Sequence, residues 1–346
     1  MNKKIHLVGL FFVFSLVSFA QPGAGYYDNA NNKSDAALKT ALFNIIKNPD
    51  VLSYKGLWTA FYTTDSKDGK VWDMYSDCSF TFGNDQCGNY SNVCDCYNRE
   101  HSFPKSWFND ASPMYSDLFH LYPTDGKVNG MRGNYPFGEV TNGTEWGTGK
   151  VGSARSGLGY SGTVFEPADE YKGDFARTYF YMVTCYENRI SSWSSEMLSG
   201  STFAAWATTM LLSWHRDDPV SEKEINRNNA VEGFQGNRNP FIDYPDLVEY
   251  IWGNMKGQVW NGSGTSVDDI MIDFMIVQNP VQNEIQVQTT ENSLHYAIYS
   301  INGQIIKIGE LRGTGDIHVN ELSNGLYLLQ LQAGERKSVQ KVIINR

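Results

Sequence analysis

Hydrophobic residues recur at helical spacing in three stretches of the first 260 residues. Within residues 34–51 the apolar residues stand at positions 37, 38, 41, 42, 45 and 46, after a candidate N-cap at Ser34 and before Pro49. This spacing predicts an amphipathic helix. The aromatic-rich residues 175–189 and 201–218 predict two further helices, both buried. Because strand-like tracts are short and scattered here, the pattern favours a mostly helical α+β fold over an alternating βαβ array.

Strand patterns dominate after residue 272. Apolar residues alternate in EIQVQ, HYAIYSINGQIIKI, GLYLLQLQ and SVQKVIIN, which is typical of half-buried strands. The pair Asn302-Gly303 predicts a type I′ hairpin turn. The polar stretch GSGTSVDD that precedes these runs reads as a linker. We therefore predict a main domain at 21–260, a linker at 261–272 and a small all-β sandwich at 273–346, which carries no cluster of acids, cysteines or histidines.

The first twenty residues have the pattern of a secretory signal peptide. Lys3 and Lys4 precede an apolar run from about residue 7 to residue 17, and Ala20 is the predicted cleavage position. A membrane anchor is the alternative. The run is shorter than the roughly 20 apolar residues that a spanning helix needs, and no later stretch qualifies. We expect export and no membrane span.

Export makes the cysteines informative. Cys78, Cys87, Cys94 and Cys96 are close in sequence, whereas Cys185 stands apart. In an oxidising compartment, this count indicates two disulfides and one buried thiol. A zinc site is the alternative, but the pair of cysteines separated by one residue is tighter than the usual zinc-binding spacing.

Polar residues able to support catalysis gather in two segments. Glu100 and His101 are neighbours in YNREHSFPKSWF, and adjacent residues on a strand or helix do not face each other, so they do not form an ordinary ion pair. Residues 116–138 add Asp117, His120 and others among few apolar residues. His120 is as well explained by a structural hydrogen bond as by a second catalytic base, since its neighbours are apolar.

These residue types suit metal-assisted cleavage of a phosphodiester. His101 has a pKa suited to a general base near neutral pH. Glu100 and Asn129 offer the oxygen ligands that Mg²⁺ prefers, and Mg²⁺ needs only one or two of them from the protein. A fixed positive charge should stabilise the transition state, and either Arg132 or Arg99 could supply it. We expect one Mg²⁺, with Mn²⁺ or Ca²⁺ as alternatives.

The motifs resemble those of the bacterial endonuclease I family, in the His-Me finger (ββα-metal) class. NREHSFP and SDLFHLYPTDGKVNGMRGN carry the resemblance, which continues in FEPADEYKGDFARTYFYM and HRDDPVSEKEINRNNAVEGFQGNRNPFIDYP and covers roughly residues 35–255. It implies a ββα-metal core in which His101 at a strand end is the general base. Glu100 and Asn129 would hold one divalent ion. It also implies the disulfides Cys87–Cys96 and Cys78–Cys94.

The tail resembles the C-terminal sorting domain of the type IX secretion system. IVQNPVQNEIQVQ, IYSINGQIIKIGEL, LSNGLYLLQL and KSVQKVIINR carry this resemblance. It implies a chain exported through the periplasm to the medium or the cell surface, with the type IX machinery as partner. An adhesive or carbohydrate-binding sandwich is the alternative.

Three further residues are candidates for substrate binding: Asn134, Arg227 and Arg238. The two arginines could line a nucleic-acid groove or, equally, brace loops against carboxylates such as Asp243. The net charge of −10 and the pI of about 5.1 argue against a tight nucleic-acid binder, because such affinity comes largely from neutralising phosphates. A scavenging enzyme needs only weak, salt-sensitive binding.

We therefore expect a secreted, monomeric, metal-dependent endonuclease that cleaves DNA, and RNA as a second substrate, with little sequence preference. Two alternatives stay open. One is an exported binding or adhesion protein with an inactive nuclease-like domain, and the other is a phosphodiesterase acting on a substrate other than nucleic acid.

Overall fold

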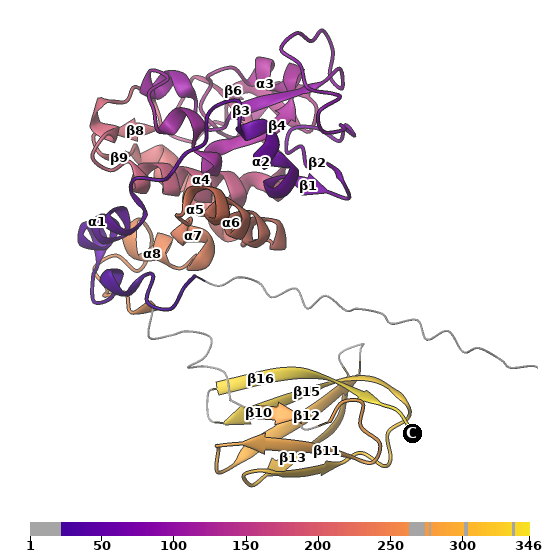
Figure 1. Cartoon of the computed structure of the whole chain (residues 1–346). Helices are drawn as coiled ribbons and strands as arrows, with labels where there is room; N and C mark the ends of the chain where they lie inside the picture. Colours follow the sequence, from indigo (N-terminus) through magenta and orange to yellow (C-terminus); the bar gives the residue numbers. More distant parts are fainter. Residues whose placement is uncertain (1–21, 263–273, 277, 301–303, 334–335) are drawn as a thin grey trace, which may run out of the picture. The chain divides into compact units, whose positions relative to one another are not determined.

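The computed structural model describes residues 22–262, 274–276, 278–300, 304–333 and 336–346 (Figure 1). The predicted signal peptide, the Asn302-Gly303 turn and most of the predicted linker lie outside these residues. The chain divides into two compact units, the second of which begins at Asn261. Each unit is described by itself below.

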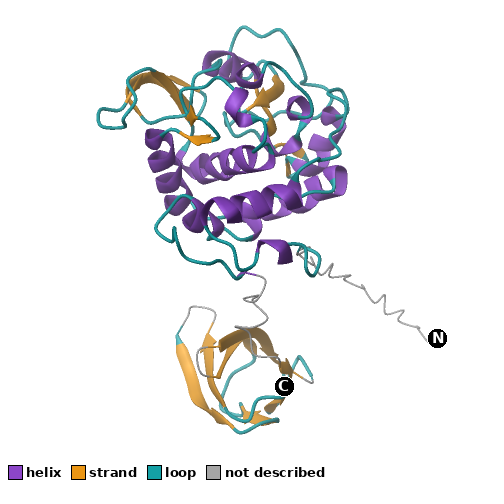
Figure 2. Cartoon of the chain, turned by 90° about the vertical axis from the view of Figure 1, so that its left-hand side faces the viewer, coloured by secondary structure: helices purple, strands orange, loops and turns teal. Residues whose placement is uncertain are grey.

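The first unit has more helix than strand, and its short strands form several small sheets that are distributed among the helices (Figure 2). Its helices are α1 (Asp35–Ile46), α2 (Leu57–Thr64), α3 (Gly126–Arg132), α4 (Lys172–Cys185), α5 (Ala205–Asp217), α6 (Glu222–Gln235), α7 (Pro240–Asp243) and α8 (Leu247–Ile251). The three helices predicted from the sequence correspond to α1, α4 and α5. Among the described residues, no helix combines the length and the apolar character that crossing a membrane requires.

The strands of the first unit form small antiparallel sheets. They are β1 (Ser66–Lys67) with β2 (Lys70–Val71), β3 (Tyr97–His101) with β4 (Leu121–Asp125), β5 (Val140–Trp146) with β6 (Gly149–Ala154) and β7 (Thr163–Glu166), and β8 (Leu198–Ser199) with β9 (Thr202–Phe203). No β-α-β alternation connects parallel strands in these sheets. The predicted α+β class is confirmed.

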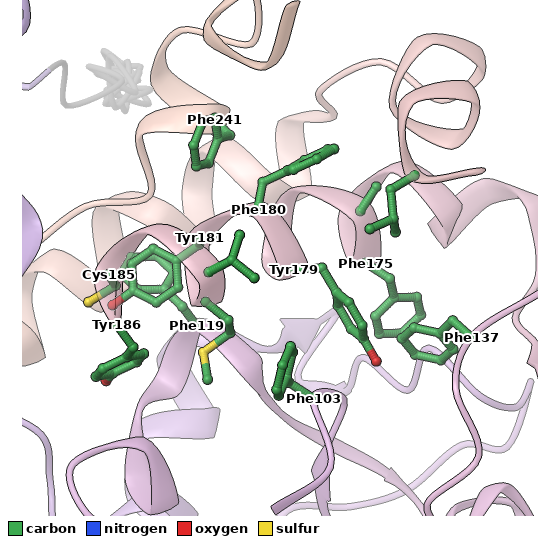
Figure 3. Packing of buried hydrophobic residues seen from close by; sticks show 14 of the residues in the cluster. Phe103, Phe119, Phe137, Phe175, Tyr179, Phe180, Tyr181, Cys185, Tyr186 and Phe241 are labelled. Carbon is green, nitrogen blue, oxygen red and sulfur yellow. The ribbon is translucent and has the colours of Figure 1, made fainter. Parts of the chain in front are cut away.

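Helix α4 forms the centre of the core. Every residue of α4 from Gly173 to Cys185 is buried. Aromatic side chains leave the helix in opposite directions: Phe180 packs toward Phe241 of α7, while Tyr179 packs on Phe103 just after β3 (Figure 3). Since α4 contacts both the other helices and the segment after β3, its packing anchors the strand that carries Glu100 and His101.

The second unit is an all-β sandwich, as predicted. One sheet has the strand order β10 (Phe274–Ile276), β11 (Glu284–Thr289), β14 (Gly315–His318), and the other has the order β13 (Ile305–Leu311), β12 (Leu294–Ser300), β15 (Gly325–Ala333), β16 (Arg336–Ile344). Alternate residues of both sheets, including Ile285, Ile298 and Leu329, fill a core of their own. The unit therefore has the hydrophobic interior that an independent domain requires.

Candidate active site

The site is built on two strands and the helix that follows them. β3 pairs antiparallel with β4, so that Glu100 lies opposite Tyr122, and α3 begins directly after β4. Asp125 caps α3 by accepting a hydrogen bond from the Val128 amide at 3.0 Å. The amide of Gly126 donates to the carbonyl of Cys96 at 2.9 Å. These bonds fix the start of α3 beside β3 and bring one face of the helix against the strand.

Asn129 faces β3 from the middle of α3. Its Nδ2 donates to Asn98 Oδ1 at 2.7 Å and to the carbonyl of Arg99 at 3.4 Å. Since both bonds use the amide nitrogen, the orientation of the amide is fixed and Oδ1 points away from these acceptors. Asn129 is partly exposed. Its oxygen is therefore available to a ligand that prefers oxygen.

Glu100 is 3% exposed, and its carboxylate is held through one oxygen. Oε1 accepts a hydrogen bond from the Tyr75 hydroxyl at 2.8 Å and an ion-pair contact from Arg132 at 2.9 Å. Burial raises the pKa of Glu100, and the nearby Arg132 charge opposes that shift. Both side-chain bonds go to Oε1, so no side-chain hydrogen bond among the described residues uses Oε2, and the backbone of His101 also favours the charged carboxylate.

His101 is held in one tautomer. Its Nε2 lies 3.0 Å from the carbonyl of Tyr115. A carbonyl only accepts, so Nε2 carries the proton and Nδ1 is the basic nitrogen. Burial, and next the charge of His120, lower the pKa of His101 to about 3, well below the near-neutral value that the sequence analysis expected of a general base. The imidazole is therefore neutral at neutral pH, which is the form that can accept a proton.

Of the two arginines that the sequence analysis offered for stabilising the transition state, Arg132 is enclosed by the protein. Its side chain is 1% exposed and donates to Glu100, to the carbonyl of His101 at 2.9 Å and to the carbonyl of Ser102. A guanidinium enclosed in this way cannot reach a substrate phosphate, so Arg132 is a positioning residue for the end of β3.

Arg99 is a cation beside the site, and Lys105, whose charge also lowers the pKa of His101, is another. Arg99 is partly exposed, and its guanidinium lies over the Tyr54 ring at 3.6 Å and the Trp58 ring at 4.4 Å. It also donates to the carbonyl of Tyr54. Burial lowers the pKa of Arg99 from its usual value. The two rings hold the guanidinium in place without neutralising its charge.

Arg227 and Arg238 do not line a groove, which corrects the substrate-binding assignment. Arg227 pairs with Asp65 at 2.8 Å and donates to the carbonyls of Leu118 and Leu121 at 2.7 and 2.8 Å. Arg238 pairs with Asp243 and Glu232, both at 2.6 Å. Both arginines are buried, so their donors are used within the protein. The alternative given in the sequence analysis, that the two arginines brace the protein against carboxylates, agrees with these contacts.

Other polar residues of the predicted segment also have structural roles. Asp117 is fully buried and accepts hydrogen bonds from the hydroxyls of Tyr181 and Tyr186 at 2.9 and 2.6 Å. His120 is also fully buried, with Nε2 2.6 Å from the carbonyl of Met114. Neither side chain is accessible to a substrate. Asn134 is exposed on the turn after α3, and its role in substrate binding stays a prediction.

Two disulfides hold the segment before β3, as the resemblance implied. They join Cys78 to Cys94 and Cys87 to Cys96, while Cys185 is a buried free thiol. The two bridges interleave, because one cysteine of each pair lies inside the loop closed by the other. Asp125 lies near Cys78 and Cys94, but sulfurs joined in a disulfide are not the thiolates that zinc requires.

Two contributors to the site have no signal in the local sequence. Tyr75 holds Glu100 from 25 residues away, and the carbonyl of Tyr115 fixes the tautomer of His101 from 14 residues away. Nothing in the sequence around Tyr75 indicates which carboxylate its hydroxyl binds, and any residue has a carbonyl. Only the fold shows these contacts.

The arrangement defines a ββα nuclease fold, with a neutral histidine and a carboxylate at a strand end and an asparagine on the following helix. The chain belongs to the endonuclease I family, whose model matches residues 34–246. It is 37% identical to an extracellular ribonuclease of Bacillus amyloliquefaciens over 237 residues, 66% of this chain and 78% of the relative. An extracellular ribonuclease of Bacillus subtilis (strain 168) is 35% identical over 254 residues, 69% of this chain and 84% of the relative.

A periplasmic deoxyribonuclease of Aeromonas hydrophila is 30% identical over 137 residues, which is 39% of this chain and 50% of that protein. The tail matches the secretion system C-terminal sorting domain over residues 278–345. The predicted type IX sorting domain is therefore confirmed, and with it the location of the chain outside the cell or on its surface. The family and its relatives support nuclease activity.

Proposed function

We propose that the chain is a secreted, metal-dependent endonuclease that hydrolyses DNA and RNA with little sequence preference. The observation that carries this proposal is the placement of three side chains around the end of β3: Glu100 and His101 are its last two residues, and Asn129 donates to the carbonyl of Arg99 beside them. The atoms we propose for the chemistry are His101 Nδ1, Glu100 Oε2 and Asn129 Oδ1. Each of these atoms is the one that its side chain leaves without a partner among the hydrogen bonds described above.

The donor set fits a hard divalent cation. Glu100 supplies a carboxylate oxygen and Asn129 an amide oxygen, which are the ligand types of Mg²⁺. Arg132 already offsets the charge of Glu100, so we expect weak binding of Mg²⁺ by the free enzyme and stronger binding once a substrate phosphate adds its own oxygens. When bound there, the ion would polarise the scissile phosphate and stabilise the leaving oxygen. Mn²⁺ and Ca²⁺ are the alternatives.

His101 is the proposed general base. With Nε2–H bound to the carbonyl of Tyr115, the Nδ1 atom takes a proton from the attacking water. No 2′-hydroxyl takes part in this step, so the same site serves DNA and RNA. The names of the relatives, which include ribonucleases and a deoxyribonuclease, support both substrates.

Arg99 is the proposed contact to the phosphate. Arg99 is partly exposed and is the residue before Glu100 on β3. Its guanidinium keeps its full charge beside two aromatic rings. A cation fixed in advance stabilises a developing charge without reorganising at the moment of reaction. The net charge of −10 opposes the approach of a polyanion, so binding should be weak, and its salt dependence should reflect a small number of phosphate contacts.

The test uses the full mature chain on plasmid DNA, single-stranded DNA, RNA and a simple phosphodiester, each with Mg²⁺ and with EDTA. We expect all three nucleic acids to be cleaved with Mg²⁺ and none of them to be cleaved in EDTA. His101→Ala should lower the rate at least about 10²-fold, since it removes proton transfer, without changing the melting temperature by more than a few degrees. The exposed His295 of the tail provides the control His295→Ala. Full activity in EDTA, or in His101→Ala, would refute the proposal.

A further inference from the structure

A row of aromatic rings leads away from β3 on the surface of the first unit. Tyr97, the first residue of β3, packs against Trp58 and Phe82, with ring centroids at 5.6 and 6.2 Å. Phe82 in turn stacks on Tyr62 at 4.4 Å with an angle of 27° between the rings. We call Trp58, Tyr62 and Phe82 the aromatic ridge. It is continuous with the strand that carries the candidate active site.

Tyr62 is the exposed member of the aromatic ridge. Its side chain is 50% exposed, although tyrosine has a large apolar ring. Tyr62 belongs to none of the core clusters of the described residues, whereas Trp58 and Phe82 both pack against two of them. Phe82 covers one face of the Tyr62 ring, so the exposed area lies on the opposite face and the edge. An aromatic face supported from behind and open in front is a platform for another flat ring.

Cations flank the aromatic ridge. The guanidinium of Arg99 lies over the Trp58 ring at 4.4 Å. On the Phe82 side, Lys70 Nζ donates to the hydroxyl of Thr81 at 2.6 Å, next to Phe82 in the chain. The same loop also contains the acidic residue Asp85. Its carboxylate accepts a hydrogen bond from the Thr81 amide at 2.6 Å and is therefore directed toward the backbone. Cations interspersed with aromatic rings form the surface that single-stranded nucleic acids require, because phosphates meet the charges and bases stack on the rings.

We propose that the aromatic ridge is a binding subsite for an unpaired nucleobase of the substrate, which stacks on Tyr62 while the neighbouring phosphates lie at Arg99 and Lys70. This inference rests on the proposed nuclease function and adds a preference for single-stranded segments of DNA or RNA. In a duplex each base is already paired and stacked on its neighbours, so it cannot lie flat on Tyr62 without an unstacking cost.

The position of Tyr62 sets the length of strand that the subsite needs. Tyr62 follows Trp58 by four residues, about 6 Å along α2 at 1.5 Å per residue. A strand whose scissile phosphate lies at Arg99 would therefore place on Tyr62 a base one or two nucleotides away. A dinucleotide is too short to use the subsite fully, whereas a strand of twelve nucleotides uses it in every binding register except those at its ends.

The experiment measures binding of fluorescently labelled dT12 and of a 12-base-pair duplex to the full mature chain in EDTA, where cleavage does not interfere. Tyr62→Ala should raise the Kd for dT12 about tenfold, because the variant loses the stacking of one base. The Kd for the duplex should stay within about twofold of the wild-type value. Tyr62→Phe keeps the ring and should bind dT12 as the wild type does. The control is Phe43→Ala, which removes a partly exposed ring that lies under Lys47 on the distant α1.

The same variants are then assayed with Mg²⁺ on a thymidine dinucleotide. We expect Tyr62→Ala to cleave it as fast as the wild type, with the loss confined to kcat/KM on dT12. An unchanged Kd of Tyr62→Ala for dT12, an equal loss in Phe43→Ala, or an equal loss on the duplex would overturn the subsite. A wild type that binds dT12 through Tyr62 but cleaves neither strand would instead overturn the nuclease function, so the two failures are distinguishable.

Discussion

Replacing Arg132 by methionine removes the positive partner of a buried carboxylate. Methionine keeps an unbranched side chain of similar length but cannot donate to Glu100 or to the carbonyls of His101 and Ser102. Breaking a buried ion pair from one side costs about 3–5 kcal/mol, because the remaining charge is left without compensation. The carbonyls lose donors as well, so we expect Arg132→Met to lower the free energy of unfolding by at least about 4 kcal/mol.

A second substitution separates the charge from the lost packing. Glu100→Gln on the background of Arg132→Met removes the uncompensated charge, and the double variant should regain about 2 kcal/mol relative to Arg132→Met. Two residues in direct contact should show such coupling in a double-mutant cycle. A gain of this kind would show that the ion pair, rather than the shape of Arg132, holds Glu100 in place.

Urea unfolding followed by tryptophan fluorescence is the assay. All nine tryptophans lie between residues 58 and 260, so the signal reports on the first unit and not on the sorting domain. The natural stability of a domain is about 5–15 kcal/mol, which makes a loss of 4 kcal/mol easy to resolve. If Arg132→Met loses less than about 1 kcal/mol, or if the double variant is no more stable than Arg132→Met, the positioning role is wrong.

Three further predictions concern pH, redox state and the tail. Burial, and next the Arg177 charge, lower the pKa of His215 to about 4. In the unfolded chain this histidine binds a proton near pH 6.5, so its contribution to the stability of the folded state is complete above pH 6.5. That contribution, about 3 kcal/mol, is lost as the pH falls through 4. Urea unfolding across this range should show a shallower slope in His215→Gln, and an equal slope would contradict the assignment. Reducing both disulfides should lower stability by about 3 kcal/mol for each loop of this length and abolish most cleavage; Cys185→Ala, which retains both bridges, should respond like the wild type, and full activity of the reduced enzyme would disprove the requirement. A chain that ends at Asn261 should cleave DNA with an unchanged kcat/KM, and a KM more than about tenfold higher on long DNA alone would assign the sorting domain a share in substrate binding.

The segments that carry Glu100, His101 and Asn129 could be predicted from the sequence because their residue types and motifs are contiguous in the chain. The contacts that orient Glu100 and His101 could not, because they come from Tyr75 and from the carbonyl of Tyr115. The roles of Arg227 and Arg238 could not be predicted in this way. The partner of Arg227 is Asp65, 162 residues earlier in the chain, and whether an arginine is buried or exposed depends on such distant partners.

The same limit applies to the fold. Helices α1, α4 and α5 have apolar residues at helical spacing, whereas α6 is polar around most of its surface and was not predicted. Its signal was the capping box, in which the Ser221 hydroxyl and the Glu224 carboxylate bond to each other's backbone amides. The sheet of β5, β6 and β7 was also missed, since most residues of β5 are exposed and polar and therefore give no alternating hydrophobic pattern.

The interleaved disulfides have a consequence for survival outside the cell, where proteases are abundant. The stretch between Cys87 and Cys94 belongs to both loops and includes exposed residues. A single cut there would separate Cys78 and Cys87 from Cys94 and Cys96 in sequence, yet both bridges would still join the two pieces. The nicked enzyme would remain one covalent molecule, with β3 attached to its neighbours, as long as the bridges stayed oxidised.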